Sequence, residues 1–251
     1  MDMVKIFGVN ICNTTLDETV NLLETYLKEN KLRTIYTPNT EIVMAAKKDE
    51  ELRDLINKGD LILADGIGLI YGSKIKKKPL KERVTGFDTS IKLLEIANTN
   101  SYSLYLLGGK DGIAKVAADN IMGKYPNINV VGYHHGYFKG SHLGLKNEPE
   151  EKAIIDEINK LNPDIIFVGF GFPKQEIWID SNKDIITGKV IIGNGGVMDI
   201  LSGNSKRAPD IFIKLGLEWL YRLFQDPSRI KRQIVLPKFL LEVIFDRNAV
   251  E

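Results

Sequence analysis

The sequence of 251 residues contains a single cysteine, Cys12, and three histidines, His134, His135 and His142. One cysteine cannot form an intramolecular disulfide, and it excludes zinc or iron–sulfur sites built from several cysteines. Three histidines leave little material for a histidine-rich metal centre. Because neighbouring residues of a strand point to opposite faces, we do not expect His134 and His135 to share an ion. The sequence therefore predicts no metal site.

Several other features are missing. No apolar run reaches the roughly 18 residues of a membrane-spanning helix, and the first ten residues, MDMVKIFGVN, lack the long apolar stretch of a secretory signal. The formal net charge of +1 gives no general reason to expect nucleic-acid binding. There is no Walker loop, no Gly-x-Ser-x-Gly turn and no Asp-x-Asp pair. We expect a cytoplasmic protein without a nucleic-acid partner.

What is present is typical of a globular α/β protein. Apolar residues make up 43% and charged residues 27% of the chain. Short β-branched runs alternate with stretches of helical periodicity, which predicts a mostly parallel, Rossmann-like sheet flanked by helices. The predicted strands are 34–36, 61–64, 103–107, 129–133, 165–168 and 190–193, and the predicted helices are 16–29, 41–47, 50–57, 87–97, 112–124 and 148–161.

Polar residues follow the first two of these strands, where ligands of such sheets bind. Thr37 and Asn39 come after strand 34–36 and either begin a helix or present a hydroxyl and an amide to a ligand. Asp65 comes after strand 61–64, followed by Gly66 and Gly68. This carboxylate is placed to act as a general base, although an Asp-Gly pair is also an ordinary turn.

Glycine-rich turns follow the later strands. Gly108 and Gly109 precede a helix whose backbone donors can hold a phosphate or ribose. Their spacing is not that of a dinucleotide fingerprint, so a nicotinamide cofactor is disfavoured. Gly195 lies in a turn that permits close approach by a ligand, and Asp199 beyond it could bind a base or sugar, cap a helix or form an ion pair. Elsewhere, Arg83 is a planar donor suited to phosphate, and Gln175 falls in the first turn of a helix.

The C-terminal segment differs in charge from the rest. Residues 205–251 carry nine lysines and arginines against six acidic residues. Apolar residues recur at helical spacing over 209–224 and again over 234–245, and Asp226-Pro227 between them should break the helix. We therefore expect a core of residues 1–204 and a basic helical appendage of residues 205–251. Such an appendage suits an anionic membrane surface, the protein body or a second subunit of a homo-oligomer.

Seven sequence strings occur in one order along nearly the whole chain: TPNTE, ADGIG, RVTGFD, LLGG, GFPKQEIW, GNGGVMD and KRAP…GLEWLYRL…DPSRIKR. Together they resemble the WecG/TagA/CpsF family of bacterial glycosyltransferases, and most of all its TagA type. The resemblance implies an inverting enzyme that needs no metal or other cofactor. It would transfer N-acetylmannosamine from a UDP-sugar donor to the 4-hydroxyl of a polyprenyl-diphosphate-linked N-acetylglucosamine acceptor. This step begins the linkage unit of wall teichoic acid, at the inner face of the cell membrane.

The resemblance also assigns roles to residues. Asp65 resembles the catalytic base of the family and Thr37 its partner in the pocket. The positions expected to contact nucleotide or sugar are Asn39, Arg83, Gln175 and Asp199, and those suited to the diphosphates are Arg222, Arg229 and Arg232. Two alternatives stay open: a related enzyme with another donor, such as UDP-N-acetylmannosaminuronic acid or UDP-glucose, and a non-catalytic nucleotide-binding module.

Overall fold

The computed structural model describes residues 2–227 and 230–251. Its central sheet contains β3 (Arg33–Tyr36), β4 (Leu61–Ile62), β5 (Ser103–Gly108), β6 (Asn129–His134), β7 (Ile165–Gly169) and β8 (Val190–Gly193). These strands are all parallel and lie in the order β4-β3-β8-β7-β5-β6. The predicted α/β class is confirmed. β4 and β6 form the two edges, so the turns that follow them lie at opposite ends of the sheet.

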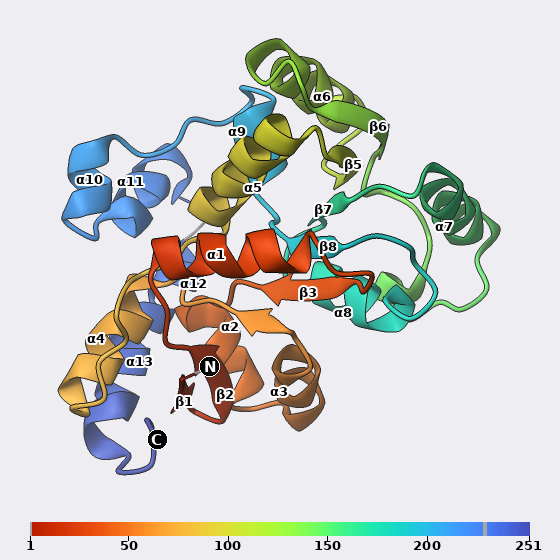
Figure 1. The fold of residues 1–251 in the computed structure, drawn as a ribbon. Helices are drawn as coiled ribbons and strands as arrows, with labels where there is room; N and C mark the ends of the chain where they lie inside the picture. Colours follow the sequence, from red (N-terminus) through yellow and green to blue (C-terminus); the bar gives the residue numbers. More distant parts are fainter. Residues whose placement is uncertain (1, 228–229) are drawn as a thin grey trace.

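Helices cover both faces of this sheet (Figure 1). Side chains of β5 alternate between two cores, with Leu104 and Leu106 in one and Tyr105 and Leu107 in the other. The first core is closed by α1 (Leu16–Tyr26), α5 (Gly86–Asn100) and α6 (Ile113–Lys124), and the second by α7 (Pro149–Leu161) and α8 (Lys174–Asn182). Strands buried on both faces explain the continuous apolar runs in the sequence.

A β-hairpin at the N-terminus was not predicted. Its strands, β1 (Met3–Ile6) and β2 (Val9–Cys12), are antiparallel. They are joined by Phe7 and Gly8, which both have positive φ, 46° and 85°. Two successive residues with positive φ are typical of a tight hairpin turn. The sequence that usually indicates such a turn is Asn-Gly, and Phe-Gly does not match it. The hairpin also pairs with the other end of the chain, through the bridge between Ile6 and Val250.

The remaining helices of the core are α2 (Thr40–Ala46), α3 (Glu50–Asn57) and α4 (Ile67–Ile75), which follow β3 and β4, and α9 (Val197–Leu201), which follows β8. A 3₁₀ turn, η1 (Ser141–Leu143), lies between β6 and α7 and contacts α8. Asn39 and Asp49 cap α2 and α3 with their side chains, which explains where these helices begin.

The C-terminal segment forms α10 (Asp210–Lys214), α11 (Glu218–Gln225), α12 (Ile230–Gln233) and α13 (Val235–Phe245). Gly216, with φ of 71°, separates α10 from α11 and interrupts the expected continuous helix. α13 contacts α4, and its Phe239 and Val243 are fully buried. The boundary between residues 204 and 205 stays a prediction, but this last helix is part of the core. Among the described residues, no helix combines the length and apolarity needed to cross a membrane.

Candidate active site

A cavity of about 1110 Å³ opens at the carboxyl ends of the strands, where the sequence places the candidate residues. The turns that follow all six strands contribute to its wall. These turns supply Thr37 and Asn39 after β3, Asp65 after β4, Gly109 after β5, Gly136 after β6, Gly171 after β7 and Gly195 after β8. The parallel sheet thus gathers into one cavity residues that are far apart in sequence.

Asp65 lines this cavity, beside the turn after β3. Its backbone N–H donates to the carbonyl oxygen of Pro38 at 3.2 Å, which extends the pairing of β3 and β4 beyond the strands. Its carboxylate accepts a hydrogen bond from the N–H of Gly86 at 3.1 Å. Burial raises the pKa of Asp65, while the Gly86 N–H and the charges of Arg222 and Arg83 act in the opposite direction. A carboxylate with a raised pKa is a stronger proton acceptor, as a general base requires.

Thr37 meets Asp65 through Gly86, the first residue of α5. The Thr37 hydroxyl donates to the carbonyl oxygen of Gly193 at 3.4 Å. A Cβ atom placed on Gly86 would lie 2.9 Å from the Thr37 Oγ1, closer than ordinary contacts allow. Glycine at position 86 therefore lets the α5 N-terminus donate to Asp65 while it touches Thr37.

Asn39 also lines the cavity, but one part of its side chain is already used. Its Oδ1 accepts from the N–H of Ile42 at 3.1 Å and caps α2. The amide NH₂ is the group that Asn39 can offer to a ligand. Both predicted readings of this residue, the helix cap and the side chain facing a ligand, are therefore compatible.

Two arginines from distant parts of the chain converge on one buried carboxylate. Glu218, at the start of α11, accepts from Arg83 at 3.3 Å and from Arg222 at 2.6 Å. Both arginines line the cavity, as does Arg232, whose Nε lies 3.6 Å from a carboxylate oxygen of Glu41. Arg229 lies outside the described residues. A pair of guanidinium groups around an anion is the arrangement that also binds phosphate oxygens.

Gln175 joins two of the glycine-rich turns. Its Oε1 accepts from the N–H groups of Gly171 at 3.1 Å and Gly195 at 3.0 Å, while its Nε2 donates to Glu176 at 2.9 Å. Burial raises the pKa of Glu176 to about 7. Gln175 lines the cavity, and these bonds within the protein indicate that it holds the two turns together; its contact with nucleotide or sugar stays a prediction.

The other predicted positions differ in how they face the cavity. Asp199, on α9, lines it and accepts from Asn204 at 3.3 Å. Gly108, by contrast, is absent from the described residues that line the cavity. Its backbone packs against Gly169, so closely that a Cβ on Gly108 would lie 2.5 Å from the carbonyl oxygen of Gly169. Its neighbour Gly109 takes that place.

Several residues of the wall were not predicted as site residues: Glu218, Trp219, Tyr137, Lys139 and His142. The spacing of Glu218 and Arg222, four residues apart on a helix, could have indicated their pairing. No comparable signal marks Lys139 and His142, because the segment after β6 reaches the cavity only through the fold.

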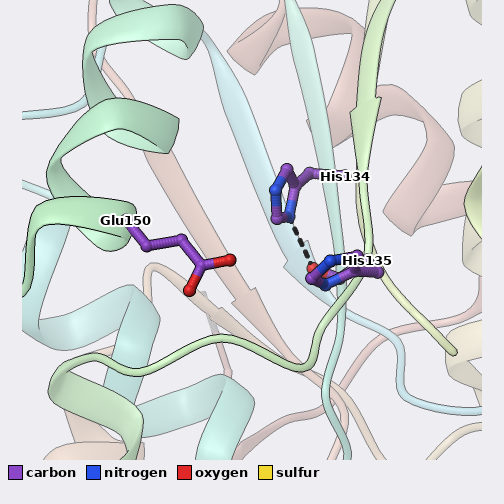
Figure 2. A group of neighbouring side chains, drawn as sticks. All are labelled: His134, His135 and Glu150. Atoms are coloured by element: carbon purple, nitrogen blue, oxygen red, sulfur yellow. Dashed lines mark hydrogen bonds between the residues drawn. The ribbon is translucent and has the colours of Figure 1, made fainter. Parts of the chain in front are cut away.

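The expectation that His134 and His135 point apart is wrong. Their ring centroids lie 4.3 Å apart, and Figure 2 shows both rings on the side of Glu150. The reason is that β6 ends at His134, so His135 lies beyond the strand, where the alternation of side chains no longer holds.

Comparison with known proteins agrees with this architecture. Residues 4–250 match the sequence profile described as "Glycosyl transferase WecG/TagA/CpsF family". The chain is 36% identical over 245 residues to an N-acetylglucosaminyldiphosphoundecaprenol N-acetyl-beta-D-mannosaminyltransferase of Bacillus subtilis (strain 168), covering 97% of this chain and 92% of the relative. It is 35% identical over 250 residues to the protein of the same name from Staphylococcus aureus (strain MRSA252), covering 99% of this chain and 94% of the relative.

Proposed function

Because the chain belongs to the WecG/TagA/CpsF family of glycosyltransferases, we propose that it transfers N-acetylmannosamine from its UDP-sugar to a lipid-linked acceptor. The acceptor is N-acetylglucosamine carried by undecaprenyl diphosphate, and the bond forms at its 4-hydroxyl. The names of the relatives from Bacillus subtilis and Staphylococcus aureus support this donor sugar and this acceptor. The product would be the β-1,4-linked disaccharide that begins wall teichoic acid.

The observation that carries the proposal is the position of Asp65 in the cavity. An alcohol is a poor nucleophile, so its proton must be removed while the oxygen attacks the anomeric carbon. An ionised Asp65 can accept that proton, and such a base typically contributes about 10²- to 10⁴-fold to the rate. Thr37, beside Gly86, is suited to orient the reacting sugar. A single displacement from an α-linked UDP-sugar inverts the anomeric centre and gives the β product.

The leaving group is UDP, whose diphosphate gains negative charge as the glycosidic bond breaks. Burial raises the pKa of Asp65, and the positive charges of Arg222 and Arg83 partly oppose this rise, so both charges act near the reacting centre. Preorganised cations of this kind stabilise developing charge more effectively than water does. In this scheme the diphosphate competes with Glu218 for the two guanidinium groups.

A lipid-linked acceptor requires the protein to reach a membrane surface. Apolar side chains of α13 are exposed, among them Ile244 (52%) and Phe245 (81%). The adjoining end of α4 exposes Ile75, next to the run Lys76-Lys77-Lys78, and Lys76 donates to the carbonyl oxygen of Ile244. Apolar side chains next to lysines are suited to an anionic bilayer. We propose that this α4–α13 surface docks on the inner face of the membrane.

A transfer assay tests the proposal. A panel of UDP-sugars would be combined with a soluble analogue of the lipid diphosphate that carries N-acetylglucosamine. We expect a β-linked disaccharide product from UDP-N-acetylmannosamine and a loss of about 10²-fold or more for Asp65→Asn. The exposed Asp54→Asn on α3 is the matched control. Transfer from a different UDP-sugar would correct the donor, near-normal transfer by Asp65→Asn would remove the base, and nucleotide binding without any transfer would favour a non-catalytic module.

A further inference from the structure

Three metal-ligating side chains come together at the opposite edge of the sheet from Asp65. Ligand atoms of His134, His135 and Glu150 all lie within 4.8 Å of one another. His134 ends β6, His135 follows it, and Glu150 belongs to the first turn of α7, so the group joins the two ends of the segment 135–149. Figure 2 shows the Glu150 carboxylate directed toward the two rings.

A hydrogen bond already orients the first imidazole. The Nδ1 of His134 lies 2.8 Å from the carbonyl oxygen of His135. A carbonyl oxygen only accepts, so Nδ1 carries the proton, and the lone pair of the neutral ring is on Nε2. Metal-binding histidines commonly have this arrangement, in which a backbone carbonyl fixes the tautomer and the ring orientation.

The imidazole of His135 needs only a small change of orientation or tautomer to become a metal ligand. The Nδ1 of His135 accepts a long hydrogen bond, 3.3 Å, from the N–H of Tyr137. Tyr137 is 71% exposed, so water can replace this bond if His135 turns or changes tautomer. Glu150 is exposed and can move as well.

We propose that His134, His135 and Glu150 bind a divalent transition-metal ion of the Zn²⁺ type, with water in the fourth position. Two imidazoles and one carboxylate suit Zn²⁺ or Co²⁺ better than Mg²⁺ or Ca²⁺, which prefer sets made up of oxygen atoms. Tetrahedral bonds of about 2.1 Å place ligand atoms about 3.4 Å apart. Ligand atoms that lie up to 4.8 Å apart must therefore close in by about 1.4 Å, and rotation of the side chains, above all of the exposed Glu150, can supply this movement.

The group is far from Asp65 across the sheet, although Glu150 also lines the cavity. Asp65 follows the edge strand β4, whereas His134 ends the other edge strand, β6. Five strand spacings of about 4.8 Å separate these two edge strands by roughly 24 Å. The ion would instead fasten the segment 135–149, which contributes Tyr137, Lys139 and His142 to the cavity wall. Its role is to hold that wall in place.

Zinc binding by the full-length chain tests the proposal, with Zn²⁺ measured by calorimetry against a competing chelator. We expect one Zn²⁺ per chain, little competition from Mg²⁺, and slower amide hydrogen exchange in residues 136–148. His134→Gln, His135→Gln and Glu150→Gln should each lower the affinity for Zn²⁺ by about 10- to 100-fold or more. This range is the effect of removing a residue that only supports a metal ligand, and removing a ligand itself should cost at least as much. The matched control is Glu51→Gln, an exposed glutamate in the first turn of α3.

One measurement requires no variant. The chain has only three histidines, so ring signals in NMR spectra can be assigned singly. Zn²⁺ should shift the signals of His134 and His135 and leave that of the buried His142 in place. Absence of Zn²⁺ binding by the unaltered chain would overturn the proposal. So would binding that all three variants retain, or a ring shift confined to His142.

Discussion

Gly86 offers a way to disturb both proposed catalytic residues without removing either. Its N–H donates to Asp65, and a Cβ at this position would lie 2.9 Å from the Thr37 Oγ1 and 3.4 Å from the Thr37 Cβ. Ordinary contacts begin at about 3.4 Å, so Gly86→Ala must displace the hydroxyl or the start of α5 by about 0.5 Å. Because a misplacement of about 1 Å can cost about 10²-fold, we expect kcat to fall about 10- to 100-fold.

Stability should change much less than turnover. Alanine is favoured over glycine in helices by about 1 kcal/mol, which offsets part of the overpacking cost of about 1–3 kcal/mol. The control is Gly123→Ala on α6, where an added Cβ meets no atom within 4 Å. The assay compares kcat of both variants with that of the unaltered protein, alongside thermal unfolding.

A double-mutant cycle shows whether the effect passes through Thr37. Thr37→Ala removes the Oγ1 and Cγ2 atoms that a Cβ on Gly86 would meet. In this background Gly86→Ala should cost little further activity, because groups in direct contact give non-additive effects. An equal loss in both backgrounds, or a near-normal kcat for Gly86→Ala alone, would refute the geometry on which the site is built.

Three further predictions follow from the same site and from the α4–α13 surface. Asp65→Asn should raise the melting temperature at neutral pH, although it lowers turnover by about 10²-fold or more. The reason is that burial raises the pKa of Asp65, so the ionised form is disfavoured in the folded state. An unchanged or lower melting temperature would contradict this. Glu176, with a folded pKa of about 7 against the usual 4.5, should make the free energy of unfolding decrease between about pH 4.5 and 7 by at most about 3 kcal/mol. Glu176→Gln should flatten that decrease in denaturant titrations, and an identical pH profile would show that Glu176 is not its source. Ile244→Asn and Phe245→Ser should weaken sedimentation of the protein with anionic vesicles but leave transfer to a soluble acceptor intact. The control is Ile185→Asn, at an exposed position on another surface. Vesicle binding equal to that of the unaltered protein would exclude α13 from docking.

Much of the fold followed from local patterns. All six strands of the sheet and the six predicted helices are present, with ends that differ by a few residues. Buried parallel strands are apolar throughout, and turns rich in glycine, proline and asparagine separate them from helices, so the period of the pattern identifies each element. The hairpin of β1 and β2 was not predicted because Phe7-Gly8 is not a usual turn sequence. In addition, Val250, which pairs with Ile6 of this hairpin, lies at the other end of the chain.

For the site, the sequence by itself determined which residue types follow each strand, and the rule for parallel sheets then indicated that Thr37, Asp65 and Gly195 face one cavity. Only the tertiary structure decided how they are joined: Gly86 between Asp65 and Thr37, Glu218 between two arginines, and Gln175 between two turns. It also reversed the expectation for His134 and His135. The physical reason is that periodicity reports the direction of a side chain only within a regular element. Contacts between turns depend instead on which strands are neighbours and on where each strand ends.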